Sequence, residues 1–184
     1  MLNRITLGVS ALAMGLALVS CAGTRLDPAQ FQSDIASGQY EAALSQLDQE
    51  SKDDVAQLLD RGLLLSSLEE YDASNEAFDK AEQKIDDLYT RSLTQEALSL
   101  LTNDRTRDYR APRFERVLIP YFRAWNYIEQ GDVEGALVEA RKINERLEFE
   151  RTQCPDEEGA CGEDAFLRFF SGLVFEWGGE WNDA

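Results

Sequence analysis

The sequence contains no histidine among its 184 residues. Histidine is the usual proton carrier of Ser-His-Asp and Cys-His catalysis, so both arrangements are excluded. A glycine-rich phosphate-binding loop is absent as well. The many Asp and Glu residues leave open a carboxylate pair of the glycosidase kind, but solvated helix faces account for them more simply. We therefore expect a protein that is not an enzyme and that carries no cofactor.

Basic residues are scarce, with 18 Lys and Arg against 35 Asp and Glu, and the formal net charge is −17. Nucleic acids and anionic lipid surfaces both select for Lys and Arg, so neither is an expected partner. A soluble, self-repelling surface is the simplest interpretation of this acidity.

Long hydrophobic runs are missing too. The apolar stretch Ile5–Val19 is shorter than the roughly 20 residues that a bilayer-spanning helix needs. It follows a positive head that contains Arg4, as in a secretory signal peptide. It ends in Leu18-Val19-Ser20-Cys21, which resembles a bacterial lipobox.

That resemblance implies a signal peptide over residues 1–20, lipidation of Cys21 and a short tether over residues 21–26. Because Ala22 rather than Asp follows the cysteine, it also implies the outer membrane, with the protein on the periplasmic face. Two or more acyl chains make such an anchor stable. The alternatives are an ordinary secretory peptide and an uncleaved N-terminal anchor.

Cysteine is rare, and two of the three cysteines remain after Cys21. Cys154 and Cys161 lie six residues apart around an acidic loop, and a disulfide is the natural expectation in an oxidising periplasm. Two free thiols are the alternative, because spacing alone does not fix the geometry. Zinc is disfavoured without histidine, and the nearby acidic residues lack the alternating spacing of a calcium loop, so we expect no metal.

The domain from 27 to 184 is expected to be all-α. Its centre, Phe114–Leu147, has apolar residues at three- and four-residue steps on both sides of Gln130-Gly131-Asp132, which predicts an antiparallel helical hairpin. Pro120 falls inside the first arm, so we expect a kink there, or else a helix start near Ile119. Further helices are expected over about 27–37, from residue 40, over about 52–68, and from residue 71 after a turn at Glu69-Glu70.

Small and bulky residues recur at related spacings in these hairpins. One set comprises Gly62, Tyr71, Ser74, Phe78 and Ala81, the central set Ala124, Tyr127, Gly131, Ala136 and Ala140, and the last set Gly172, Phe175, Gly179, Trp181 and Ala184. They resemble the signature of tetratricopeptide (TPR) repeats, and the whole is similar to an uncharacterised group of proteobacterial TPR-like lipoproteins. This resemblance implies an irregular α-solenoid in which small residues lie where paired helices approach closely.

The spacing of the repeats is uneven, which implies insertions at about Asp86–Pro112 and Thr152–Asp164. The end of the chain reads as the opening of a helix whose remainder is missing. We therefore expect C-terminal truncation, with Phe169, Phe170, Phe175 and Trp177 partly uncovered.

One basic cluster stands against the acidic background: Arg105, Arg107, Arg110, Arg113 and Arg116. Guanidinium groups suit carboxylates and phosphates, so this cluster is a candidate anion site. Pairing with the protein's own acidic helices is the simpler alternative.

The resemblance also implies a partner surface, because the first helix of each hairpin lines the inner groove of a TPR-like stack. The positions concerned are Leu59, Leu63, Tyr121, Trp125, Phe169, Leu173 and Trp177. Helical spacing does not distinguish an open face from a core that the 86–112 segment covers. We expect a lipid-anchored envelope adaptor for a protein or peptide partner. A peptidoglycan-acting enzyme with an unrecognised carboxylate and a small-ligand binding lipoprotein are the alternatives.

Overall fold

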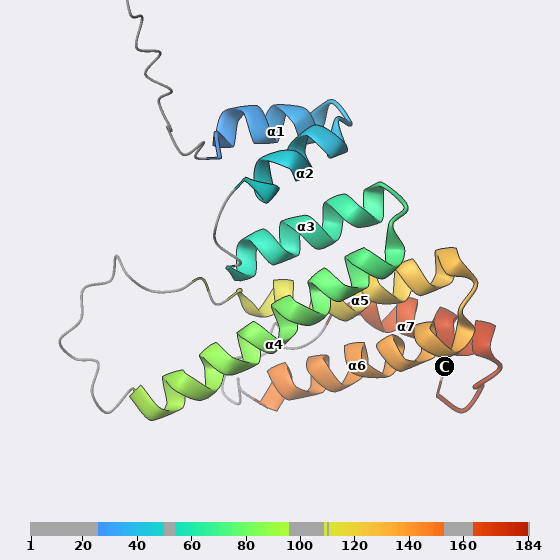
Figure 1. Cartoon of the computed structure of the whole chain (residues 1–184). Coiled ribbons are helices and arrows are strands. Elements are labelled where there is room, and N and C mark those ends of the chain that lie inside the picture. The colour runs from blue at the N-terminus through green and yellow to red at the C-terminus, as the bar shows by residue number, and fades with distance from the viewer. Residues whose placement is uncertain (1–25, 50–53, 96–108, 110, 153–163, 184) are drawn as a thin grey trace, which may run out of the picture.

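The computed structural model describes residues 26–49, 54–95, 109, 111–152 and 164–183 (Figure 1). Regular structure in these residues is entirely helical, which confirms the expected all-α class. The helices are α1 (Pro28–Ala36), α2 (Tyr40–Asp48), α3 (Val55–Ser67), α4 (Tyr71–Gln95), α5 (Arg113–Gln130), α6 (Val133–Thr152) and α7 (Ala165–Gly178). Among these described helices, none combines the length and the apolar character needed to cross a membrane.

The helices stack in chain order, and each packs mainly against the helices before and after it (Figure 1). The α1–α2 pair lies at one end of the stack. α3 and α5, the first helices of two successive hairpins, are also in direct contact. That contact brings two of the expected partner-facing helices side by side.

Helix ends form where the sequence supplies caps. The side chain of Asp27 accepts hydrogen bonds from the backbone N–H groups of Ala29 and Gln30, as expected for an N-cap before proline. Asp132 caps α6 by accepting from Gly135 N at 3.0 Å. Gly131 ends α5 with a left-handed φ of 71°, which a residue without Cβ adopts readily.

The two helices of the α3–α4 hairpin approach closely at a glycine. A Cβ on Gly62 would lie 2.6 Å from the ring of Phe78, closer than real side chains pack. The hydroxyl of Ser74 donates to the carbonyl of Gly62 at 2.7 Å, so the contact is fixed by a hydrogen bond as well. This is the role that the spacing of the small residues predicts.

The hydrophobic core consists of three apolar clusters that follow one another along the stack of helices. The first cluster joins α1, α2 and α3 through Phe31, Ala43, Leu47 and Leu64. The second joins α3, α4 and α5 through Val55, Phe78, Ile85 and Ile119. The third joins α5, α6 and α7 through Val117, Leu137, Ile143, Leu167 and Phe175. Each cluster thus fixes one helix against its neighbours in the chain.

α5 is one helix across Pro120, so the alternative of a helix start near Ile119 is wrong. α4 continues to Gln95, so the first residues of the expected insertion at about Asp86–Pro112 are helical. Ile85 and Leu88 pack against the second cluster there, which is why the helix runs on.

The expectation of an uncovered final helix was wrong for two residues. Phe170 and Phe175 are 7% and 2% exposed, because α7 packs them against α5 and α6. Phe169 and Trp177 are exposed, as expected.

Candidate binding surface

The expected partner-facing positions lie on α3, α5 and α7, and none of the seven belongs to the buried core. Trp125 is 45% exposed and Phe169 is 65% exposed, while Leu63, Leu173 and Trp177 are exposed as well. Leu59 and Tyr121 are partly buried. Residues 96–108 and 110, which the core interpretation would place over these positions, lie outside the described residues, so the open face stays a prediction.

Ring contacts tie α5 to α7 on this side of the molecule. The ring centroid of Tyr121 lies 4.8 Å from that of Phe170 and 5.5 Å from that of Phe166, both with edge-to-face geometry. Trp125 lies 6.4 Å from Phe170. We use the name aromatic face for the surface formed by Tyr121, Trp125, Phe166, Phe169, Leu173 and Trp177. Tyr121, Trp125 and Phe166 contact the buried ring of Phe170, while Phe169, Leu173 and Trp177 are exposed on α7.

Phe166 was not among the predicted residues, although it is 56% exposed and contacts both Tyr121 and Phe170. Its signal in the sequence is the helical step from Phe166 to Phe169 and on to Leu173.

A cavity of about 320 Å³ lies between α3 and α5, next to the aromatic face. We call it the α3–α5 cavity. The residues that line it are mostly apolar: Ala56, Leu59, Leu63, Phe78, Leu118, Ile119 and Phe122, with Asp60, Tyr109 and Glu115 supplying its polar groups. Tyr121 of the aromatic face contacts Phe122 of the cavity lining, with ring centroids 5.1 Å apart.

The polar groups of the α3–α5 cavity are acidic. Burial raises the pKa of the Asp60 carboxyl, and the negative charges of Asp54 and Glu115 raise it further. The Tyr109 hydroxyl donates to the Glu115 carboxylate. Burial together with this hydrogen bond raises the pKa of Tyr109 to about 12, so the tyrosine remains a donor at neutral pH.

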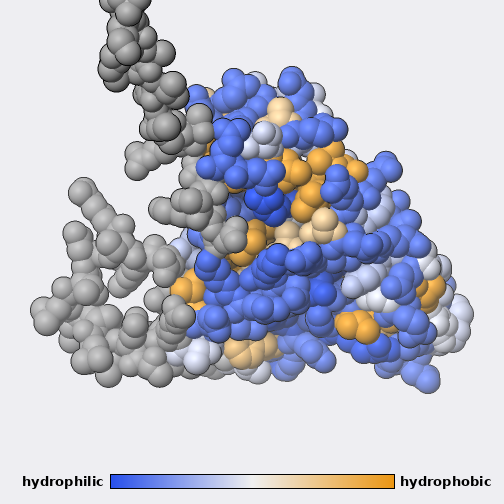
Figure 2. All heavy atoms as spheres, viewed as in Figure 1, coloured by the Kyte–Doolittle hydropathy of each residue, from blue (hydrophilic) through white to orange (hydrophobic). Residues whose placement is uncertain are grey.

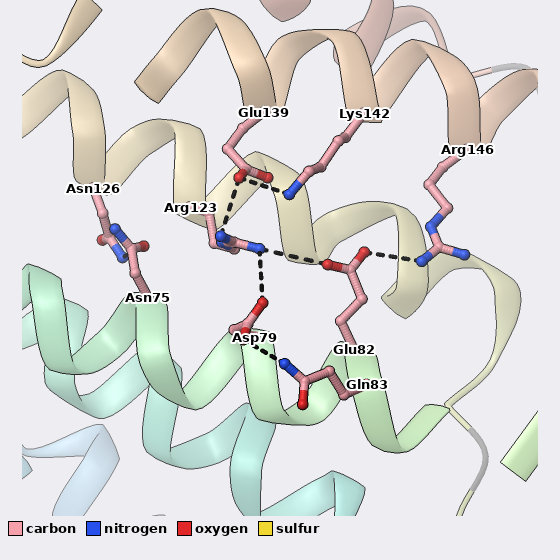
Figure 3. A network of polar contacts seen from close by, with 9 residues as sticks. All are labelled: Asn75, Asp79, Glu82, Gln83, Arg123, Asn126, Glu139, Lys142 and Arg146. Carbon is pink, nitrogen blue, oxygen red and sulfur yellow. Dashed lines mark hydrogen bonds and ion pairs between the residues drawn. The ribbon is translucent and has the colours of Figure 1, made fainter. Parts of the chain in front are cut away.

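A buried ionic network lies at the junction of α4, α5 and α6 (Figure 3). Arg123 of α5, 8% exposed, reaches Glu139 of α6 at 3.2 Å and Glu82 of α4 at 3.4 Å. Arg146 of α6 lies 2.9 Å from the other oxygen of Glu82, and Lys142 lies 3.0 Å from Glu139. Asp79 of α4 lies 3.9 Å from Arg123 as well, so charges from three helices meet around this arginine.

Glu139 is the most deeply buried member of this network, at 1% exposed. Burial raises the pKa of its carboxyl, while the positive charges of Arg123 and Lys142 act in the opposite direction. One of its oxygens, Oε2, has no hydrogen-bond partner. The network is consequently sensitive to the loss of any one charge, because a single buried charge left without its partner is costly.

Amide and hydroxyl groups extend the network toward α3. Asn126 accepts from the Ser66 hydroxyl at 2.6 Å and donates to Ser74 Oγ at 2.9 Å and to Asn75 Oδ1 at 2.8 Å. Asn126 is fully buried, and its partners come from α3 and α4. The polar contacts of α5 thus fix its position against three other helices.

The side of the molecule shown in Figure 2, where α4 and α6 lie in front, is mainly hydrophilic. Exposed apolar residues also occur on α6, where Val138 and Phe149 are examples, and Phe149 packs edge-on against Tyr89 of α4. These two residues provide a comparison surface for the aromatic face.

The structure describes two of the five arginines of the candidate anion site. Arg113 lies 3.4 Å and Arg116 3.0 Å from the buried carboxylate of Glu150 on α6, so both pair with the protein's own acidic helix. Arg105, Arg107 and Arg110 lie outside the described residues, as do Cys21, Cys154 and Cys161. Asp164, one of the acidic residues beside the loop between the two cysteines, caps α7 by accepting from Leu167 N at 3.0 Å.

Comparisons of the chain with protein families, with curated proteins and with solved structures gave no match.

Proposed function

We propose that this protein is a lipid-anchored adaptor of the bacterial outer membrane, exposed to the periplasm, which binds a protein or peptide partner through its aromatic face. In this proposal the helices form an irregular TPR-like solenoid, and the protein has no catalytic activity of its own. The lipobox-like sequence ending at Cys21 supports the anchor.

The observation that carries the proposal is the exposure of large apolar side chains along α5 and α7. Soluble proteins seldom leave contiguous apolar surface open to water unless it serves an interaction. Tryptophan and other aromatic residues are also the usual hot spots of interfaces, because they desolvate a large area at a small cost in rotamer freedom. Trp125, Phe166, Phe169 and Trp177 have this character.

The packing behind the aromatic face supports a binding role, because it holds α5 in one position. Phe170 is buried under Tyr121 and Trp125, and the ionic network holds α5 against α4 and α6 on its other side. A surface whose side chains are already fixed loses little entropy on association.

Affinity capture from envelope extracts tests the proposal. The bait is the purified chain, compared with the double variant Trp125→Ala/Phe169→Ala and with the control Val138→Ala/Phe149→Ala on α6. We expect a partner that the wild type and the control retain and that the aromatic-face variant loses. Equal retention by all three baits would refute a role for the aromatic face.

The anchor is tested separately. Cys21→Ser should abolish fatty-acid labelling and release the protein from the membrane fraction, because the thiol is the acyl acceptor in the proposed modification. Unchanged labelling of this variant would contradict the lipoprotein assignment.

The absence of catalysis is tested by incubating the purified protein with peptidoglycan. We expect no release of soluble fragments. Release that is lost on replacing one carboxylate would establish the enzymatic alternative.

A further inference from the structure

The α3–α5 cavity combines an apolar lining with two carboxylates. Among its described lining residues, Asp60 and Glu115 carry charge, and no Lys or Arg lies with them. Elsewhere in the described chain the three strongly buried carboxylates have donors at hand: Glu139 has Arg123 and Lys142, Glu150 has Arg113 and Arg116, and Asp34 accepts from the side-chain amides of Gln30 and Gln46. The structure gives no such ion pair within the described residues for Asp60 or Glu115.

Without a bound cation, this arrangement of charges opposes folding. The carboxyl of Asp60 is partly buried, and Asp54 and Glu115 add repulsion, which together raise its pKa. Glu115 accepts from the neutral Tyr109 hydroxyl, so its negative charge is not cancelled. A cation supplied from outside would relieve both carboxylates at once.

We propose that the α3–α5 cavity binds a partner polypeptide at a basic residue that is adjacent to a large apolar one. The apolar side chain occupies the cavity between Leu59, Phe78 and Phe122, and the ammonium or guanidinium group lies between Asp60 and Glu115. This inference rests on the proposed adaptor function, since it names the chemistry that the partner must present.

The size of the cavity favours a side chain over a larger ligand. Its volume, about 320 Å³, lies at the lower end of the roughly 300–1,000 Å³ range of small-molecule sites. Leu63 and Tyr109 on its lining are exposed, so the cavity opens to solvent. Phe122 of its lining contacts Tyr121 of the aromatic face, so the two sites are neighbours.

Fluorescence anisotropy on the full chain tests the proposal with three labelled peptides of equal length. One alternates Leu with Lys, one Leu with Glu, and one Ala with Lys. We expect the Leu-Lys peptide to bind and the other two to bind at least about 10-fold more weakly, the factor expected for losing a charge-assisted contact or a buried side chain. Equal binding of the Ala-Lys peptide would overturn the role of the cavity, because it would show attraction to the acidic surface alone.

Matched charge variants locate the site. Asp60→Asn and Glu115→Gln should each weaken Leu-Lys binding by about 10-fold. Asp87→Asn, which removes the same charge from an exposed position on α4, should change it less than about twofold. Equal losses in all three variants would overturn the proposal in favour of long-range attraction. Asp60→Asn removes an unfavourable charge, so an unchanged or raised melting temperature shows that lost binding is not lost folding.

Hexylamine serves as the small-molecule competitor. We expect it to displace the Leu-Lys peptide only at concentrations far above those of the unlabelled peptide. Displacement at equal concentrations would assign the cavity to a small amphiphilic amine and overturn the polypeptide proposal.

The two proposals fail in different ways. If Asp60→Asn and Glu115→Gln bind the peptide normally while partner capture still depends on Trp125 and Phe169, the cavity inference is wrong and the adaptor function stands. If capture is insensitive to Trp125 and Phe169, the adaptor function through the aromatic face fails whatever the peptides do.

Discussion

Two residues of α5 that are only two positions apart have opposite environments. Arg123 is 8% exposed and contacts carboxylates of α4 and α6, whereas Trp125 is 45% exposed and rests on Phe170 of α7. Ordinary partitioning would place the arginine in water and the tryptophan in the core. In this helix a buried arginine is part of the scaffold, while a tryptophan remains exposed beside the buried apolar residues Val117, Ile119 and Ala124.

The difference is informative because both choices carry a cost. A buried ion pair is weak evidence for stability, since desolvation offsets most of its attraction. A buried charge is costly without its partner, however. The Arg123–Glu139 pair therefore disfavours any arrangement of α4, α5 and α6 that separates the two side chains. The exposed aromatic face gives up hydrophobic stabilisation, and a binding surface is the physical account of that loss.

The largest expected effect comes from breaking the buried side. Arg123→Ala leaves Glu139 without its main cationic partner inside the protein and should lower the free energy of unfolding by about 3–5 kcal/mol. Urea denaturation of the two proteins measures this. Arg141→Ala removes one partner of the exposed Arg141–Glu180 pair and should cost less than about 1 kcal/mol. Similar losses in both variants would mean that the network does not fix the helices.

Substitutions on the aromatic face should weaken partner binding and leave the stability of the fold nearly unchanged. Trp125→Ala/Phe169→Ala should weaken partner binding by about 2–4 kcal/mol, as hot-spot residues do. The melting temperature should move little, since much of both side chains is already in water. Tyr121 is unsuited to this test because it contacts Phe122, Phe166 and Phe170, and its removal would disturb packing. A large loss of stability with unchanged binding would assign the aromatic face to the core.

A smaller effect is expected at the amide that joins α5 to α3 and α4. Asn126→Ala removes the hydrogen bonds to Ser66, Ser74 and Asn75 and leaves those groups buried without it. It should lower the free energy of unfolding by about 1–3 kcal/mol, which chemical denaturation can measure. Gln83→Ala, at an exposed position that bonds Asp79 within α4, is the control and should have little effect.

The smallest effect concerns Asp60, and its sign is opposite. The folded state raises the pKa of this carboxyl above its ordinary 3.8, so its ionised form opposes folding at neutral pH. Asp60→Asn should therefore stabilise the protein at pH 7 by about 0.5–1 kcal/mol. As the pH falls through the folded-state pKa the wild-type carboxyl becomes neutral, and the difference should vanish below the ordinary value. Denaturant midpoints of both proteins across this range would show it, and a difference that grows in acid would be inconsistent with the assigned environment.

The sequence predicted much of the fold because helical spacing and caps are local signals. The hairpin around Gly131 and Asp132, the α1 cap at Asp27 and the close approach at Gly62 all follow from residues near each other in the chain. The position of Pro120 was ambiguous locally, and packing of Val117 and Ile119 on two different clusters keeps α5 continuous across it.

The sequence did not predict the buried ionic network, because a charged residue on a helix usually lies on the solvent-exposed face. A signal was nevertheless available at Glu139 and Glu150, which fall in step with the apolar stripe of Ala136, Ile143 and Leu147. What no local pattern supplies is the partner: Glu82 lies 41 positions before Arg123, and only the stacked helices bring them together. The α3–α5 cavity was hidden for the same reason, since its lining comes from separate parts of the chain.

Site-specific photocrosslinking in cells tests the central claim most directly. A benzophenone amino acid replaces Phe169 on the aromatic face of α7 in one protein and Phe149 on α6 in another, both exposed positions where an aromatic ring is already present. If the aromatic face is the partner surface, irradiation should give a discrete crosslinked product from position 169 and none from position 149. A product from position 149 alone, or none from 169 in membranes that retain the anchored protein, would contradict it.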